Sequence, residues 1–105
     1  IKAYYLDGQI FLIKRWWSNK CDYGKKGDPI KASTSLTNII RKCAAVLNLN
    51  LFGVDIVISQ GKPFVVDIQE FGSFVGVPNA PVLLAEFIAS HLKTIFPKQS
   101  KLLRL

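Results

Sequence analysis

Two aspartates lie within segment 51–69, which contains the most hydrophobic strand-like runs of this chain. One run precedes a turn at Gln60-Gly61 and contains Asp55, and the other follows the turn and contains Asp67. Only seven residues of the chain are acidic, so this position among apolar neighbours is unexpected. A carboxylate in such surroundings costs free energy unless it is paired, protonated or bound to a cation. The two aspartates are therefore candidates for a cation site, and the alternative is that they lie on a solvent-exposed face of a sheet.

The register of the two runs decides whether these carboxylates act together. Asp67 and Gln69 share one face of a strand, because side chains alternate between the faces. A three-residue loop would pair Ser59 with Pro63, and glycine-containing loops of this kind are common. That loop sets Asp55 opposite Asp67, whereas a two-residue loop would separate the carboxylates. We favour the three-residue loop, which puts two carboxylates and an amide oxygen on one wall and suits Mg²⁺ held with substrate phosphates.

The residues around both aspartates resemble the ATP-grasp superfamily. The resemblance is carried by Phe52-Gly-Val-Asp-Ile-Val and by Phe64-Val-Val-Asp-Ile-Gln-Glu-Phe-Gly-Ser-Phe-Val-Gly-Val-Pro78, and it extends over residues 1–95. In that family, an acidic residue and a later acidic-x-Asn motif ligate the Mg²⁺ ions that bridge the ATP phosphates. The resemblance therefore implies that Asp55 and Asp67 are metal ligands. It implies the same for Gln69, which stands where the family usually has Asn.

The resemblance also implies an activity. It suggests an ATP- and Mg²⁺-dependent carboxylate–amine ligase with an acyl-phosphate intermediate, similar to the ribosomal-protein glutamate ligases, with this chain supplying the metal- and phosphate-binding half. The first alternative is an inositol-phosphate kinase of the same superfamily, and the second is a non-catalytic fragment that binds anions or nucleic acid. The expected partners are ATP, a small-molecule carboxylate or inositol phosphate, and a missing N-terminal half or partner domain. Neither a membrane nor a nucleic acid is an expected partner.

Four further residues are candidates for nucleotide contact. Lys14 and Arg15 lie near the end of a predicted strand and point to opposite faces, so one of them shares the face that the sheet presents to its ligand. If that face lines a nucleotide cleft, this residue would meet phosphate oxygens. Related enzymes carry a basic residue near the end of the matching strand, which implies a catalytic and nucleotide-binding role. The alternative is an edge-strand charge that discourages aggregation. Ser73 and Gly76 lie in a loop that leads into a helix, where free backbone amides favour an anion.

The elements that must position these residues are four strands and two helices. The strands are expected at residues 1–6, at 9–17 and on both sides of Gln60-Gly61, and the helices at 34–48 and 81–96. Thr34 or Ser35 can cap the first helix, and Asn79 the second. Segment 18–33 has no periodicity and is expected to be a loop. The predicted order is β-β-α-β-β-α, an α+β fold with an antiparallel sheet and helices on one face, which is half of an ATP-grasp fold.

Composition limits the organisation of the chain. Its 105 residues allow one domain at most, and we expect residues 1–96 to be the C-terminal part of an ATP-grasp domain and 97–105 to be a basic tail. The absence of Met, even at position 1, suggests a fragment. A net charge of +7 favours anionic partners, although solvated surface charge is the alternative. The two cysteines lack metal-ligand spacing and no signal peptide is visible, so a reducing cytoplasmic setting is expected.

Overall fold

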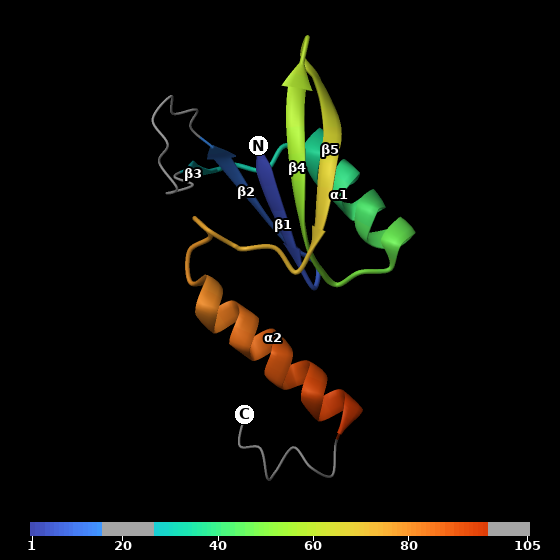
Figure 1. The fold of residues 1–105 in the computed structure, drawn as a ribbon, viewed down its shortest axis with the longest axis vertical. Coiled ribbons are helices and arrows are strands. Elements are labelled where there is room, and N and C mark those ends of the chain that lie inside the picture. Colours follow the sequence, from blue (N-terminus) through green and yellow to red (C-terminus); the bar gives the residue numbers. More distant parts are fainter. Residues whose placement is uncertain (16–26, 97–105) are drawn as a thin grey trace.

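The computed structural model describes residues 1–15 and 27–96 of the chain. This part contains five strands and two helices (Figure 1). In chain order they are β1 (Lys2–Leu6), β2 (Gln9–Arg15), β3 (Gly27–Ile30), α1 (Thr34–Leu47), β4 (Leu51–Ser59), β5 (Lys62–Glu70) and α2 (Ala80–Ile95). The fold is α+β, as predicted. The expected tail at 97–105 lies outside the described residues.

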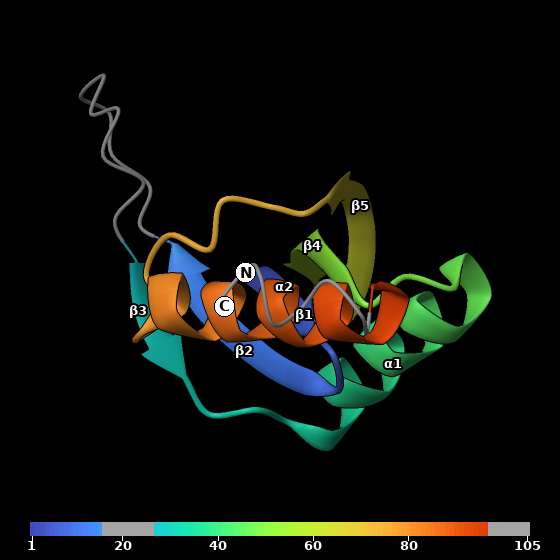
Figure 2. The same cartoon turned by 90° about the horizontal axis from the view of Figure 1, so that it is seen from below.

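The five strands form one antiparallel sheet in the order β3-β2-β1-β4-β5. Figure 2 shows β3 and β5 at its two edges. The predicted hairpin turn at Asp7-Gly8 is present, and both of its residues have a positive φ, as a tight two-residue turn requires. In this strand order, β1 is the central strand of the sheet, although it comes first in the chain. It pairs with β4 so that Lys2 lies opposite Asp55.

Strand β3 corrects the expectation that segment 18–33 is a loop. It is a four-residue edge strand that pairs with β2, with Asp28 opposite Lys14. Pro29 lacks a backbone N–H, and an edge strand tolerates this because one side of it makes no ladder hydrogen bonds. A Cβ on Gly27 would lie 2.6 Å from the Ile13 side chain, so the close approach of β3 to β2 requires glycine here.

The helices begin close to the predicted positions, but the N-cap residue of α1 differs from the prediction. Ser33, rather than Thr34 or Ser35, caps α1, and its hydroxyl accepts a hydrogen bond from the backbone N–H of Leu36. Ser33 has the extended backbone that an N-cap residue needs, whereas the two candidates already lie within the helix. Asn79 is the N-cap residue of α2, as predicted, although its side chain makes no capping hydrogen bond.

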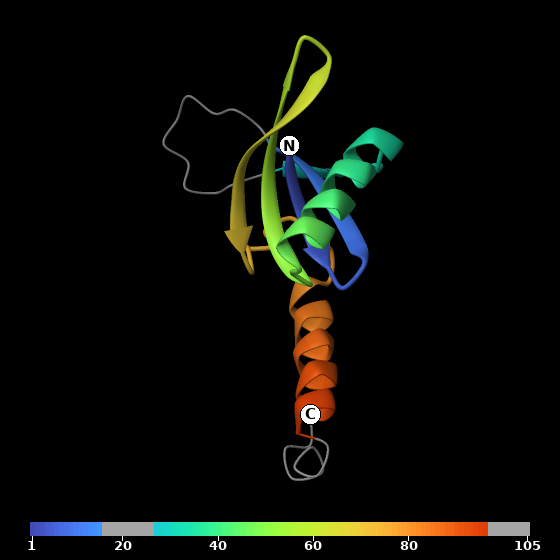
Figure 3. The same ribbon diagram turned by 90° about the vertical axis from the view of Figure 1, so that its right-hand side faces the viewer.

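The two helices pack against opposite faces of the sheet, which corrects the expectation that both lie on one face. One face carries a core in which Leu36 and Ile40 of α1 pack against Ala3, Leu12, Phe52, Val54 and Ile56. The other face carries a core in which Leu83, Leu84 and Phe87 of α2 pack against Tyr4, Leu6 and Ile13, together with Phe74, Val77 and Ala80. The segment after β5 crosses to this second face, so α2 starts there. Figure 3 shows that α2 then extends beyond the end of the sheet.

Apolar side chains remain exposed on β5 and on the far half of α2. Phe64 and Val66 of β5 are 51% and 60% exposed, and Ile95 of α2 is 52% exposed. Exposed apolar surface of this kind can mark a site that another protein unit covers. Within the described part of the chain, no helix combines the length and apolar character needed to cross a membrane.

Candidate phosphate- and metal-binding site

Asp55 and Asp67 lie directly opposite each other on β4 and β5, as predicted. The turn between the strands is not the predicted one. Ser59 pairs with Lys62 across a two-residue turn, instead of with Pro63 across a three-residue loop. Both residues of the turn have a positive φ, which matches the twist of a two-residue hairpin. The expected loop was therefore wrong, while the expected pairing of the carboxylates is confirmed.

A β-bulge reconciles these two findings. Ile56 pairs with Val65, and the next pair along the ladder is Asp55 with Asp67, so Val66 has no partner. An extra residue in one strand shifts the register by one position and bends the strand. The bulge thus cancels the shift that the shorter turn introduces, and Asp55 and Asp67 lie directly opposite each other.

Lys2 connects the two aspartates through Gln69, and the sequence analysis did not single it out. Its Nζ donates to Asp55 Oδ1 at 2.9 Å and to Gln69 Oε1 at 2.7 Å. Gln69 Nε2 in turn donates to Asp67 Oδ2 at 3.1 Å. The Lys2 side chain is only 5% exposed, whereas that of Asp55 is 37% exposed. The four side chains form one continuous series of charge-assisted hydrogen bonds across β1, β4 and β5.

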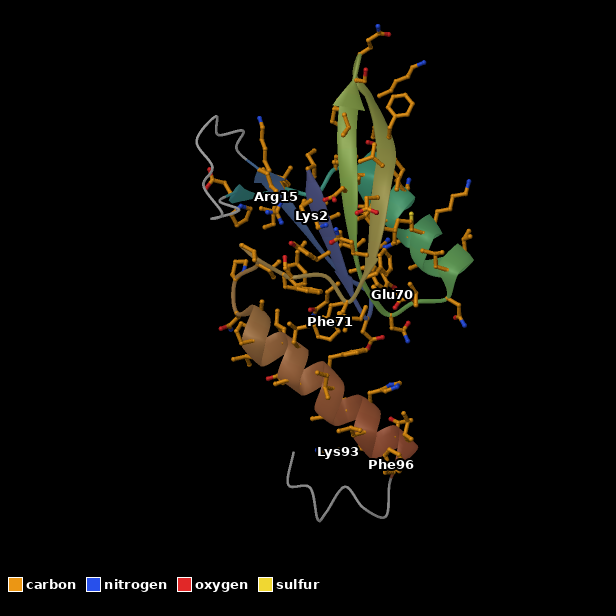
Figure 4. All side chains as sticks on the ribbon, in the orientation of Figure 1. Lys2, Arg15, Glu70, Phe71, Lys93 and Phe96 are labelled. Atoms are coloured by element: carbon orange, nitrogen blue, oxygen red, sulfur yellow. The ribbon has the colours of Figure 1, made fainter. Side chains whose placement is uncertain are left out.

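A pocket of about 250 Å³ lies over this series and is lined by Lys2, Arg15, Asp55 and Gln69. Figure 4 shows Lys2 and Arg15, which come from adjoining ends of β1 and β2. An ammonium and a guanidinium that face one pocket suit anionic oxygens, and a guanidinium can bind a phosphate or carboxylate through two N–H groups. Of the two basic candidates on β2, the structure brings Arg15 to the pocket. Lys14 is exposed and, by the alternation of β2, lies on the opposite face.

The loop between β5 and α2 reaches the site through Tyr4. Ser73 is exposed, and its Oγ lies 3.1 Å from the Tyr4 hydroxyl, which accepts a hydrogen bond from Arg15 Nη2 at 3.0 Å. Gly76 has a φ of +88° and packs against β2, where a Cβ would lie 3.3 Å from the Ile13 side chain. Neither Ser73 nor Gly76 lines the pocket itself. The structure links Ser73 to the pocket indirectly, and the contacts of Gly76 are packing contacts.

The donor atoms at this site fit a divalent cation in their chemistry. Within residues 1–15 and 27–96, no three His, Cys, Asp or Glu side chains group together, so a metal ion would depend on Asp55, Asp67 and the amide oxygen of Gln69. Two carboxylates and an amide oxygen are hard ligands of the kind that Mg²⁺ prefers. The Lys2 ammonium already contacts two of these three residues, and it acts as an internal cation among them.

The fold matches part of known enzymes. No protein-family model and no curated protein matches this sequence. Two solved structures of the ATP-grasp ligase PsnB do match in fold, one complexed with minimal precursor, Mg and ADP, and one with minimal precursor. Their TM-scores are 0.58 and 0.57 at 17% and 18% sequence identity, over 83% and 84% of this chain. The chain spans only 31% and 32% of the PsnB chains, so it has the fold of about a third of an ATP-grasp ligase.

Proposed function

We propose that this chain supplies the metal- and phosphate-binding half of an ATP- and Mg²⁺-dependent carboxylate–amine ligase. The observation that carries the proposal is the pocket in which Lys2, Arg15, Asp55 and Gln69 meet on a sheet with an ATP-grasp fold. PsnB, which shares this fold, was solved with Mg and ADP. An ATP-dependent reaction also fits the cytoplasmic location expected from the sequence.

Lys2 and Arg15 bind the phosphate oxygens of the nucleotide in this proposal. A lysine ammonium has three N–H donors, and Lys2 uses one for Asp55 and one for Gln69. One donor is left for a phosphate oxygen. Arg15 offers a planar group that can contact two phosphate oxygens at once. Because Lys2 is buried, its head group is held in place before the nucleotide arrives, which lowers the entropic cost of binding.

Asp55, Asp67 and Gln69 hold Mg²⁺. When bound, the ion lowers the charge of the phosphates and orients the terminal phosphoryl group for in-line attack. The hydrogen bond from Gln69 Nε2 to Asp67 fixes the orientation of the amide. Its oxygen therefore faces Lys2 and the pocket, as a ligand oxygen must. Gln69 has a longer side chain than the Asn of the family motif, and its amide reaches both Lys2 and Asp67.

The acceptor in this proposal is a carboxylate. One of its oxygens attacks the γ-phosphorus, the bond to the β-phosphate oxygen breaks, and ADP leaves. An amine then attacks the acyl phosphate and releases inorganic phosphate, which forms the amide and frees a proton. The minimal precursor in the PsnB structures is a property of that enzyme, and the acceptor of this chain is not specified beyond its chemical class.

The kinase alternative is favoured by one feature of the pocket. Two cationic side chains, Lys2 and Arg15, face the same space, and the whole chain carries a net charge of +7. This surplus suits an acceptor with several phosphate groups, such as an inositol phosphate. In that reaction a hydroxyl oxygen attacks the γ-phosphorus, ADP leaves and the hydroxyl proton is released.

A second unit completes the active site, either as a further part of the same polypeptide or as a partner domain. The chain spans about a third of PsnB. The exposed apolar side chains of β5 and α2, among them Phe64, Val66 and Ile95, support such a covering unit. Burial of apolar surface contributes roughly 25 cal/mol per Å², so covering these side chains would stabilise the assembly.

The proposal is tested by nucleotide binding to the complete natural protein that contains this chain. Calorimetric titration with Mg·ATP compares the wild type with Asp67→Asn, which keeps the size of the side chain and removes its charge. We expect at least a tenfold loss of affinity for Asp67→Asn. Asp28→Asn is the matched control, because Asp28 is also an exposed aspartate on an edge strand but pairs with β2, far from β5 in the strand order.

Two outcomes decide between the candidates. Mg·ATP binding that is equal in wild type and Asp67→Asn would contradict the metal site. If binding does depend on Asp67, release of ADP in the presence of a carboxylate and an amine supports the ligase, and release that requires an inositol phosphate supports the kinase. Oligonucleotide binding that falls with salt and is unchanged in Asp67→Asn would support the non-catalytic alternative.

A further inference from the structure

The hydroxyl of Tyr4 joins the pocket to the loop after β5. Tyr4 is fully buried in the central strand β1. Its oxygen accepts a hydrogen bond from Arg15 Nη2 at 3.0 Å and lies 3.1 Å from Ser73 Oγ. Arg15 and Ser73 come from segments that lie far apart in the sequence. A single buried atom therefore connects a cation of the pocket with an exposed hydroxyl of the loop.

The direction of these hydrogen bonds follows from the chemistry of the three groups. A guanidinium can only donate, so the Tyr4 oxygen accepts from Arg15. If that oxygen also accepted from Ser73, the phenolic hydrogen would be buried without an acceptor, which is costly. The phenolic hydrogen thus goes to Ser73 Oγ. The hydroxyl of Ser73 keeps its own hydrogen, and because Ser73 is exposed, it can donate that hydrogen to a ligand.

The ring of Tyr4 is closely packed on one face and along one edge, which fixes the position of its hydroxyl. The Phe74 ring stacks on it with centroids 4.6 Å apart and an interplanar angle of 25°. Gly53 and Gly72 lie against one edge of the ring, where a Cβ would be 3.5 Å and 3.2 Å from its carbon atoms. Close packing of this kind leaves little room for the ring to move. The hydroxyl can therefore serve as a fixed reference point for both of its partners.

We infer that Tyr4 is a positioning residue: it holds Arg15 at the pocket and makes the Ser73 hydroxyl a donor to a phosphate oxygen of the ligand. The inference rests on the proposed function, because it requires that the pocket binds a phosphate compound. The phosphate belongs to the nucleotide or to a phosphorylated acceptor. Tyr4 itself touches neither, since it is fully buried. It acts through the two residues that its hydroxyl contacts.

Tyr4→Phe in the complete natural protein tests this role, because it removes the hydroxyl and keeps the ring that stacks on Phe74. The probes are Mg·ATP and a myo-inositol phosphate, titrated separately, so that the source of the phosphate is identified by the ligand that is affected. We expect fivefold to twentyfold weaker binding of at least one probe. Tyr5→Phe is the matched control, since Tyr5 is the next residue of β1, lies on the other face and stacks on Phe52. It should bind both probes like the wild type.

Two further variants separate a positioning role from a general structural one. Ser73→Ala should weaken binding of the same probe, and Ser73→Thr, which keeps a hydroxyl, should restore it. The double variant Tyr4→Phe with Ser73→Ala should bind no more weakly than Tyr4→Phe alone, because the Ser73 hydroxyl donates to the ligand only while the Tyr4 hydroxyl orients it. Additive losses in the double variant would overturn the inference.

The remaining outcomes separate this inference from the proposed function. If the wild type binds a probe and Tyr4→Phe binds it equally well, the role of Tyr4 is wrong and the proposed function stands. If the wild type binds neither probe, the proposed function is wrong and the inference falls with it.

Discussion

Lys2 Nζ lies 2.9 Å from Asp55 Oδ1, across the pair formed by the central strand and β4. The lysine is buried and the carboxylate is partly exposed, so the cationic partner cannot leave the contact without moving out of the core. The same nitrogen also contacts Gln69. Asp55 and Gln69, two of the three residues expected to bind a metal ion, thus already contact a positive charge, the Lys2 ammonium.

Replacement of Lys2 by Met should therefore have opposite effects on two ligands. Removal of a competing cation should raise the affinity for Mn²⁺ in the absence of nucleotide by roughly threefold to tenfold, since unit charges about 4 Å apart interact by about 1 kcal/mol where water screens them, and Asp55 is partly exposed. Loss of a phosphate contact should weaken binding of ATP. Electron paramagnetic resonance titration with Mn²⁺ and calorimetry with Mg·ATP measure the two effects. Lys14→Met, on the other face of the sheet, is the control, and unchanged or weaker Mn²⁺ binding would contradict the competition.

Gly72 and Gly61 offer a paired test of the packing around Tyr4. Their φ values are similar, +73° and +75°, but a Cβ on Gly72 would meet the Tyr4 ring at 3.2 Å while a Cβ on Gly61 would meet nothing within 4 Å. Gly61→Ala should cost about 1 kcal/mol from backbone strain alone. Gly72→Ala should cost that amount plus about 1–3 kcal/mol of overpacking. Urea denaturation measures both, and equal losses would show that the loop moves aside easily.

The cap of α1 gives a prediction about stability alone. Ser33→Ala should lower the free energy of unfolding by about 1 kcal/mol, because it removes the side chain that accepts from the Leu36 N–H. Ser35→Ala should lower it by only about 0.5 kcal/mol or less, as expected for an exposed position within the helix. Thermal unfolding of the two variants compares them directly. A larger loss for Ser35→Ala would indicate that the cap lies where the sequence first suggested.

Phe64→Lys tests whether a second unit covers β5. In the chain of 105 residues, the substitution should cost less than about 1 kcal/mol, because half of the Phe64 side chain is already exposed. With the proposed second unit in place it should cost about 2–4 kcal/mol if that unit buries the ring, as a charge in a covered apolar site must be desolvated. Denaturant titration of both forms provides the comparison. Equal losses in the two forms would mean that nothing covers this part of the strand.

The sequence predicted the paired carboxylates because they break an apolar pattern. Lys2 breaks the apolar pattern of β1 in the same way, and the same criterion applied to basic residues would have found it. The register between β4 and β5 was harder to predict, because it depends on two local features whose shifts cancel. The turn has two residues instead of three, and Val66 is an extra residue in β5. A bulge at a valine among other β-branched residues leaves no mark in the sequence.

The face of the sheet on which each helix packs could not be predicted from the apolar pattern of the helix alone. Helix α1 and helix α2 were both predicted from their apolar stripes, but a stripe does not say which face of the sheet it meets. The residues of β1 carry that information, since Ala3 and Tyr4 are both fully buried although they point to opposite faces. β3 was missed because four residues that include Gly27 and Pro29 carry no strand-like alternation.

The central position of β1 has a consequence for how the protein folds. The hairpins β1–β2 and β4–β5 are each local, whereas the contact between β1 and β4 joins residues about fifty positions apart in the chain. Long-range pairing of this kind forms slowly, because a long loop must close first. Lys2 belongs to one hairpin and Asp55 to the other, so their ion pair forms across the contact between the two hairpins. A nascent chain therefore possesses neither the ion pair between Lys2 and Asp55 nor the pocket beside it until the two hairpins have docked.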